Sequence, residues 1–194
     1  MPPVRKHAMN ITSLLELDAR LSSKMRVAEK PGTLRNIAIF LAHSGDSWFW
    51  GLALIVIWFF SSATWKEWAV VLFVAISLLA VIVLVIKLFV RRRRPEGEWG
   101  GIYRNTDPHS FPSGHAARAF LIAVIGSALG PEWLGILLWI WAPLVALARV
   151  AMGVHYLSDV LAGSLLGIVV GVVGLQFYEA FFAWLANLTG FPLW

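Results

Sequence analysis

Long apolar runs constrain this chain more than any other feature of its sequence. A bilayer core of about 30 Å needs roughly 20 apolar residues in each spanning helix, and hydrophobic residues make up 59% of the 194 positions. We expect an all-α integral membrane helix bundle. Five segments fit its helices, namely 36–61 (or 47–63 if His43-Ser-Gly-Asp46 breaks the helix), 68–90, 115–129, 133–152 and a last helix that starts near residue 159.

The residues before these runs have a different pattern. Between positions 10 and 30, leucines such as Leu14 and Leu21 recur near helical spacing with basic residues between them. A helix of this kind tends to lie in the plane of the membrane interface, and the alternative is a solvated basic arm. We expect a single domain over 1–194 with five to six helices, in which an amphipathic interfacial helix over 10–30 precedes a transmembrane bundle over 36–188.

The expected helix over 115–129 is short for a membrane span. At 1.5 Å per residue its length is about 22 Å, which is less than the thickness of the hydrocarbon core. We infer that His115, at its start, lies recessed near the level of the lipid headgroups. A substrate anchored in the bilayer would then enter sideways between helices.

Composition argues against several functional classes. The net charge of +5 is better explained by anionic lipid surfaces than by nucleic acid in so apolar a chain. The sequence has no cysteine, which excludes disulfides and thiolate metal sites. It also lacks a cluster of carboxylates suited to magnesium. We therefore expect no nucleic-acid partner, no metal and no cofactor.

Counting membrane crossings brings the ionisable residues together. Two helices separate the loop after 68–90 from the loop after 133–152, so both loops lie on the same face. Ionisable residues at the ends of membrane spans are functional candidates by default. Those of the two loops and their flanks are Lys87, Arg94, His115, Arg149, His155 and Asp159.

Three of these residues and one helix start suit a phosphate group. Lys87, Arg94 and Arg149 supply positive charge, and arginine can bind phosphate oxygens in bidentate fashion. Ser113 is a good N-cap residue, and Gly114 lets a ligand approach the backbone closely. The positive end of the following helix then favours an anion. The alternative is an ordinary capped helix start.

The two histidines suit acid–base and nucleophilic chemistry. His115 lies in a first helical turn, where it can donate a proton to a leaving oxygen. His155 and Asp159 are four positions apart and share a helix face. A carboxylate on one ring nitrogen fixes the tautomer and makes the other nitrogen more basic. This arrangement suits a nucleophile that attacks phosphorus or a base that activates water, and the alternative is a structural hydrogen bond.

Other ionisable residues have less definite roles. The arginines at 91–93 are interpreted as a basic stripe that meets lipid headgroups. Arg118, one turn beyond His115, is either a group behind the site or a headgroup contact. His43 and Asp46 either break the first helix or face the bundle interior, and they stay unassigned.

Together the three segments resemble the signature motifs of the type-2 phosphatidic acid phosphatase family, whose site is similar to that of vanadium haloperoxidases. Residues 87–95 match Lys-x6-Arg-Pro, and residues 112–115 match Pro-Ser-Gly-His. Residues 148–159 match Ser-Arg-x5-His-x3-Asp, except that Ala148 stands in place of serine. The matches occur in order and at suitable spacing across about a third of the chain.

The resemblance implies a role for each matched residue. His155 would be the nucleophile that forms a phosphohistidine, Asp159 would orient it, and His115 would protonate the leaving lipid oxygen. No metal would be required. The residues that would hold the phosphate are Lys87, Arg94, Ser113, Gly114 and Arg149.

We therefore expect a lipid phosphatase that hydrolyses a phosphomonoester or a terminal diphosphate on a phospholipid or polyprenyl carrier. The alternatives are a lipid phosphotransferase that uses the same site and a non-catalytic protein that binds or transports lipid phosphates. We expect a multi-pass protein of the cell membrane. Of the 16 lysines and arginines, only Lys66 falls on the face opposite the site. Basic loops tend to stay cytoplasmic, which favours a cytoplasmic site, although family members often face outward.

Overall fold

The computed structural model describes residues 10–27, 29–105 and 107–190, and these residues form helices without any strand. The prediction of an all-α membrane bundle is confirmed, with more helices than the five to six expected. One extra helix lies in a loop, and another arises because the first span is broken. The eight helices of the described residues are α1 (Ile11–Lys24), α2 (Thr33–Ser44), α3 (Ser47–Phe60), α4 (Ala63–Val90), α5 (Glu98–Arg104), α6 (Gly114–Leu129), α7 (Glu132–Ala151) and α8 (Leu157–Thr189).

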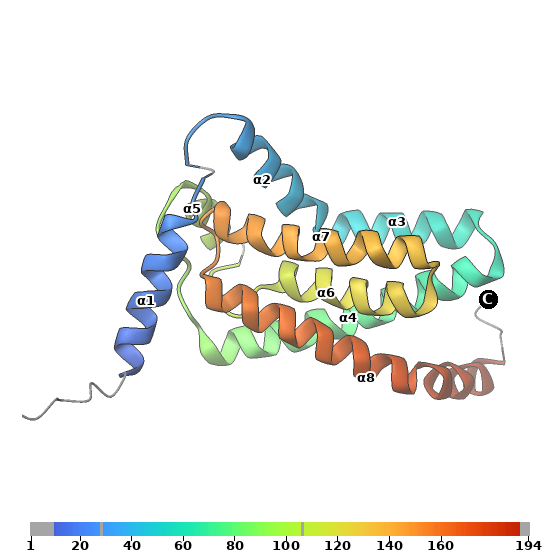
Figure 1. Ribbon diagram of the computed structural model, residues 1–194. Coiled ribbons are helices and arrows are strands. Elements are labelled where there is room, and N and C mark those ends of the chain that lie inside the picture. Colours follow the sequence, from blue (N-terminus) through green and yellow to red (C-terminus); the bar gives the residue numbers. More distant parts are fainter. Residues whose placement is uncertain (1–9, 28, 106, 191–194) are drawn as a thin grey trace, which may run out of the picture.

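Helix α6 forms the centre of the bundle and packs against α4, α7 and α8 (Figure 1). Close approach between α6 and α8 depends on glycines. A Cβ atom at Gly163 would lie 2.4 Å from the carbonyl oxygen of Ser113, and one at Gly167 would lie 2.0 Å from that of Ala117. Small residues at such contacts let membrane helices approach closely. The start of α6, which carries the candidate phosphate-binding residues, is thus pressed directly against the start of α8.

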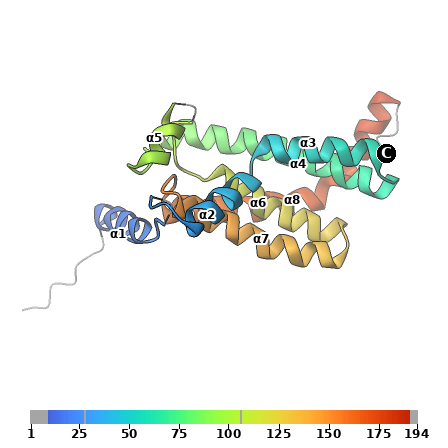
Figure 2. The same cartoon turned by 90° about the horizontal axis from the view of Figure 1, so that it is seen from above.

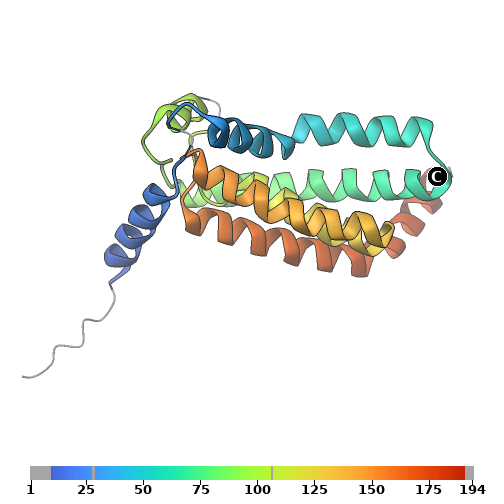
Figure 3. The ribbon, with the colours of Figure 1, turned by 45° about the horizontal axis from the view of Figure 1, so that its top comes forward.

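Among the described residues, three helices are long and apolar enough to cross a membrane by themselves, and a fourth span requires α2 and α3 together. These three are α4, α7 and α8, whereas α6 is a shorter apolar helix. Helices α2 and α3 meet at an angle of 55°, and Figure 3 shows them end to end along one side of the bundle. In Figure 2 α3 lies beside α4, against which it packs. The protein is therefore a multi-span membrane protein.

The break between α2 and α3 bears on both ranges expected for the first span, because α3 alone has 14 residues and reaches the length of a span only together with α2. A continuous helix over 36–61 is wrong, because the chain leaves helical geometry between Ser44 and Ser47. Carbonyl oxygens here bond to side chains from elsewhere in the fold. Arg118 Nε donates to Gly45 O over 2.8 Å, and Trp50 Nε1 donates to Ser44 O over 3.0 Å.

Helices α1 and α5 lie at the same end of the bundle (Figure 1). Helix α1 is shorter than the predicted range of 10–30, and it exposes leucines such as Leu14 and Leu15. Its other face docks on the start of α8, where Ser22 Oγ accepts from Leu157 N over 2.8 Å and Asp18 accepts from Ser158 N over 3.0 Å. A solvated basic arm does not fit this docked helix.

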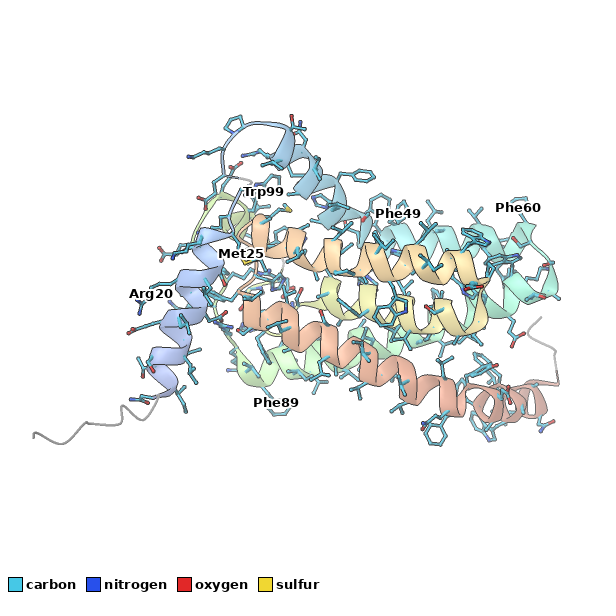
Figure 4. All side chains as sticks on the ribbon, in the orientation of Figure 1. Arg20, Met25, Phe49, Phe60, Phe89 and Trp99 are labelled. Carbon is cyan, nitrogen blue, oxygen red and sulfur yellow. The ribbon has the colours of Figure 1, made fainter. Side chains whose placement is uncertain are left out.

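Large aromatic side chains project away from the bundle, as Figure 4 shows for three phenylalanines. Phe60 and Phe89 are 85% and 83% exposed, and Phe49 is 46% exposed. Apolar side chains this exposed need an apolar surrounding, and a bilayer supplies one. The polar and charged residues that are buried instead gather at the end of the bundle near α1 and α5.

Candidate active site

The three sequence motifs meet at one end of the bundle. Arg94 Nη1 lies 3.1 Å from His155 Nε2, which joins the first motif to the third. Ser113 N donates to Asp159 O over 2.9 Å, which joins the second motif to the third. A cavity of about 390 Å³ is lined by residues of all three motifs, among them Lys87, Gly114, His115 and His155.

His155 is 1% exposed and lies in the turn between α7 and α8. Burial lowers the pKa of His155 to about 3; Asp159 opposes this shift, while the charges of Arg94 and Arg149 add to it. Its ring is therefore neutral at neutral pH, with Nε2 on the Arg94 side. Nδ1 lies 3.6 Å from Asp159 Oδ2, which is longer than a hydrogen bond.

Asp159 is fully buried and its carboxylate has two close partners besides His155. Oδ2 accepts from the backbone N–H of Tyr156 over 2.8 Å, which caps the start of α8. Oδ1 accepts from Arg92 Nη1 over 2.6 Å. Asp159 thus holds the turn that carries His155 in addition to facing its ring.

Arg92 corrects the interpretation of residues 91–93 as a stripe that meets headgroups. Its side chain is only 18% exposed and bridges Asp18 of α1, at 2.7 Å, and Asp159 of α8. Its guanidinium also lies 3.9 Å from the centre of the Tyr156 ring. Because α4 ends at a left-handed residue, Arg91, the following arginines leave the helix in different directions. Four consecutive arginines look alike in the sequence, so no local signal could have singled out Arg92.

Lys87 and Arg94 share one anionic partner, the carboxylate of Asp107. Lys87 Nζ pairs with Oδ2, and Arg94 Nη2 reaches the same oxygen over 2.8 Å. Burial raises the pKa of Asp107, but the hydrogen bond from Lys87 and the charges of Lys87 and Arg94 outweigh it and hold the pKa below its ordinary value. An ionised carboxylate therefore binds the two cationic side chains that were predicted from the sequence to bind phosphate. Sequence reasoning missed Asp107.

Arg149 lies behind the cavity at the end of α7 and is fully buried. Its Nη1 lies 3.3 Å from the hydroxyl of Tyr103. Nε and Nη2 have no hydrogen-bond partner within the described part of the chain. The guanidiniums of Arg149 and Arg94 lie 4.8 Å and 5.2 Å from the Tyr103 ring of α5. Two unpaired guanidinium N–H groups on a buried cation are suited to bind the oxygens of a phosphate.

Ser113 and Gly114 begin α6 as expected. Ser113 is buried and its Oγ accepts from Ala116 N over 3.4 Å, a long N-cap contact. Gly114 lines the cavity. The first turn of α6 thus directs its backbone N–H groups toward the region where the cationic side chains meet.

His115 lines the cavity from the first turn of α6. Its Nε2 is 2.7 Å from Asp46 Oδ1, so Asp46 faces the interior of the site. Arg118 is 7% exposed and bonds to Gly45 and Ser47. A headgroup contact therefore does not fit Arg118, which lines the inner end of the cavity beside His115 and holds the bend between α2 and α3.

The cavity continues from the charged residues along an apolar wall. The lining residues of this wall come from α4 and are Ile76, Leu79, Ala80, Val83, Leu84 and Leu88. Leu84 and Leu88 are 56% and 51% exposed on the outside of the bundle. One cavity therefore joins a cationic end to a lipid-facing surface.

Metal binding has no ready set of ligands here. Across residues 10–27, 29–105 and 107–190, no three histidine or carboxylate side chains lie close enough to hold one ion. The buried cationic side chains fit an anionic group instead.

The comparisons with known proteins agree with the motifs. The model of the PAP2 superfamily matches residues 68–183. The chain is 29% identical to the probable lipid phosphate phosphatase beta of Arabidopsis thaliana, over 86% of this chain and 91% of that protein. It is 32% identical to the decaprenylphosphoryl-5-phosphoribose phosphatase of Mycobacterium tuberculosis, over 81% of this chain and 88% of that protein.

A solved structure has the same arrangement of helices. It is the transmembrane PAP2-type phosphatidylglycerolphosphate phosphatase from Bacillus subtilis, with a TM-score of 0.71 and 25% identity over 89% of this chain and 90% of that one. The resemblance read from the motifs is confirmed by the sequence match and by the fold. This chain belongs to the PAP2 superfamily.

Proposed function

We propose that this protein is a membrane phosphatase that removes a phosphate group from a lipid or polyprenyl carrier. One observation carries the proposal. A single cavity has a buried neutral histidine among cationic side chains at one end and an apolar wall of α4 at the other. The first end suits a phosphate and the second suits a hydrocarbon tail. Its relatives include phosphatases of a lipid phosphate and of a decaprenyl phosphate derivative.

The proposed reaction has two steps at phosphorus. His155 Nε2 attacks, a P–N bond forms, and the P–O bond to the lipid breaks as His115 protonates the leaving oxygen. Water then attacks the phosphohistidine and releases phosphate. Lys87, Arg94 and Arg149 neutralise the charge on the phosphoryl oxygens, which is most of what phosphoryl transfer needs.

The substrate's phosphate has to replace the carboxylate of Asp107 on Lys87 and Arg94. Both bind Asp107 Oδ2, and a phosphate offers more acceptor oxygens to the same two donors. Asp107 thus keeps the cations paired until substrate arrives. It also makes displacement of a carboxylate part of substrate binding.

Lateral entry of the lipid follows from the same cavity. Helix α6 has 16 residues and spans about 24 Å, so its first turn lies within the bilayer depth that a headgroup reaches. The apolar wall of α4 leads from that turn to the outside of the bundle. Phosphate esters with an apolar tail should therefore be hydrolysed far faster than short soluble esters.

We also propose that the site end faces the cytoplasm in the cell membrane. Helices α1 and α5 lie at this end (Figure 3), and basic segments tend to stay cytoplasmic. The chain has no cysteine, so a cysteine placed at exposed Asn105 is a unique label. A membrane-impermeant thiol reagent should fail to label Asn105→Cys in intact cells. Labelling without permeabilisation would place the site on the outer face.

The test of the activity is phosphate release by the purified protein from a panel of lipid and polyprenyl phosphates, with EDTA present throughout. His155→Ala is the control. We expect release by the wild type that EDTA does not change, and none by His155→Ala. Activity that requires added metal, or that survives in His155→Ala, would contradict the proposal.

A further inference from the structure

A group of titratable side chains that the proposed reaction leaves unused lies behind His115. His115 Nε2 is 2.7 Å from Asp46 Oδ1, and the other oxygen of Asp46 is 3.0 Å from His43 Nδ1. Asp46 and His115 are 69 positions apart. Only the fold brings the bend between α2 and α3 against the first turn of α6.

The bend that carries Asp46 is held from three sides. Arg118 of α6 donates from Nε to Gly45 O over 2.8 Å, and Trp141 of α7 donates to Ser44 Oγ over 2.9 Å. Trp50 of α3 donates to Ser44 O over 3.0 Å. Asp46 is therefore placed by membrane helices rather than by a loose surface loop, as a positioning residue requires.

The carboxylate of Asp46 is also diverted from its usual local role. Asp46 occupies the N-cap position of α3, where aspartate ordinarily accepts from the backbone of the first turn. Here its side chain makes no such cap bond. Its oxygens instead accept from His115, from His43 and from Trp48 Nε1 at 3.2 Å. The helix end gives up a stabilising bond, and His115 gains a partly buried carboxylate partner.

We propose that Asp46 is the positioning residue of the general acid: it holds Nε2–H of His115, so that Nδ1 is the nitrogen that exchanges protons with the substrate and with water. This inference rests on the proposed function. His43 and Trp48 hold the second oxygen of Asp46 and so fix the direction of the carboxylate. Asp46 itself keeps its charge throughout, as the orienting carboxylate of a histidine does.

His115 loses one proton in the first step and regains one in the second. In the first step the His115 imidazolium gives its Nδ1 proton to the lipid oxygen as the P–O bond breaks. The Nε2 proton stays on the ring and remains hydrogen-bonded to Asp46. In the second step Nδ1 takes a proton from the attacking water while the P–N bond breaks and its electron pair returns to His155. His115 is then an imidazolium again. Asp46 favours this charged form electrostatically and fixes the neutral tautomer between the steps.

The leaving group provides the test. Two phosphomonoesters with the same alkyl tail are compared, one an alkyl ester and one a nitrophenyl ester, whose phenolate leaves without a proton. Rates are compared as kcat/KM, which reports only on steps up to departure of the leaving group. Asp46→Asn should lower kcat/KM for the alkyl ester by about 10²-fold and for the nitrophenyl ester by less than about tenfold. An equal loss on both esters would overturn the proposal.

Two further variants separate positioning from folding. Glu132→Gln removes an exposed carboxylate at the first turn of α7 and should leave both rates unchanged. The double variant Asp46→Asn with His115→Ala should be no slower than His115→Ala alone, because Asp46 acts through His115. An additional loss in the double variant would show a structural role and overturn the inference, even if the single variant accumulates poorly.

Failure of the inference is distinguishable from failure of the proposed function. If the protein is not a phosphatase, the wild type releases no phosphate from either ester. If it is one and Asp46 does not position His115, the wild type and His155→Ala behave as proposed while the loss in Asp46→Asn is independent of the leaving group.

Discussion

Two histidine–carboxylate pairs contribute their histidines to the lining of one cavity, and the pairs differ in sequence spacing, burial and distance. His155 and Asp159 are four positions apart, fully buried and separated by 3.6 Å. His115 and Asp46 come from distant parts of the chain, are partly exposed and lie 2.7 Å apart. In the first pair the carboxylate is largely occupied by Arg92 and by the backbone of Tyr156.

The difference matches the two roles proposed for the rings. A nucleophile needs a neutral nitrogen with a free electron pair, so a loose carboxylate contact and surrounding cations suit His155. A proton donor needs an imidazolium, and at His115 the close carboxylate of Asp46 opposes burial and the charges of Arg149 and Arg118, which disfavour that form. The two histidines therefore divide the chemistry because their surroundings differ.

The largest effect expected is that of removing the nucleophile. His155→Ala should lower phosphate release by at least about 10³-fold, because the proposed covalent intermediate forms on Nε2 of this ring. Phosphate release from a lipid ester, followed by a coupled phosphate assay, measures this. A loss of less than about tenfold would show that water attacks phosphorus without a covalent intermediate on His155.

The second effect concerns the carboxylate of the same pair. Asp159→Asn should lower kcat/KM by about 10²-fold for alkyl and nitrophenyl esters alike, since it acts on the attacking nitrogen rather than on the leaving group. This pattern is the opposite of the one expected for Asp46→Asn. Arg92→Gln, which removes a partner of Asp159 and also its bridge to Asp18 but leaves the carboxylate itself in place, serves as the milder comparison. A leaving-group-dependent loss in Asp159→Asn would erase the distinction between the pairs.

A smaller effect is expected at Asp107, which lines the same cavity and pairs with Lys87 and Arg94. Asp107→Asn removes the anion that competes for Lys87 and Arg94, so inorganic phosphate should inhibit more strongly, by up to about tenfold or about 1.4 kcal/mol. Inhibition constants for phosphate measure the change. Glu96→Gln, in the same loop, is the matched control. Weaker inhibition in Asp107→Asn would mean that Asp107 helps to build the anion site.

The last prediction concerns pH and the stability of the free protein rather than the reaction rate. The pKa of His155 is about 3 in the fold and is ordinarily about 6.5, so between these values the unfolded chain binds a proton that the folded chain does not. Above about pH 6.5 the ring is neutral in both states, so its titration does not lower the free energy of unfolding. As the pH falls from 6.5 toward 3, protonation of the unfolded chain lowers the free energy of unfolding progressively. Thermal unfolding in detergent should therefore show the wild type losing stability relative to His155→Gln below pH 6.5. A pH-independent difference would contradict the low pKa.

The parts of the site that are local in sequence could be predicted, and the parts that depend on distant contacts could not. Helix counting placed Lys87, His115 and His155 at one end of the bundle, and the fold brings them around one cavity. The pairing of His155 with Asp159 follows from helical spacing. Asp46 has no such spacing to His115, so the sequence left open whether it breaks the first helix or faces the bundle interior.

The same limit applies to Arg92 and Asp107. Arg92 is one of four consecutive arginines, and its contacts depend on how the chain turns after α4 and on where α1 docks. Asp107 lies in a connection without periodicity, so nothing in the sequence directs it to Lys87 and Arg94. Tertiary packing, which local pattern does not encode, decides both positions.

The central claim is that phosphate passes through a covalent bond to His155, and stereochemistry at phosphorus tests it most directly. The substrate is a lipid thiophosphate monoester made chiral with ¹⁶O and ¹⁸O, and hydrolysis takes place in H₂¹⁷O. Two successive in-line displacements, first by His155 and then by water, predict thiophosphate with retained configuration. Inverted configuration would show a single direct attack by water and would contradict the account.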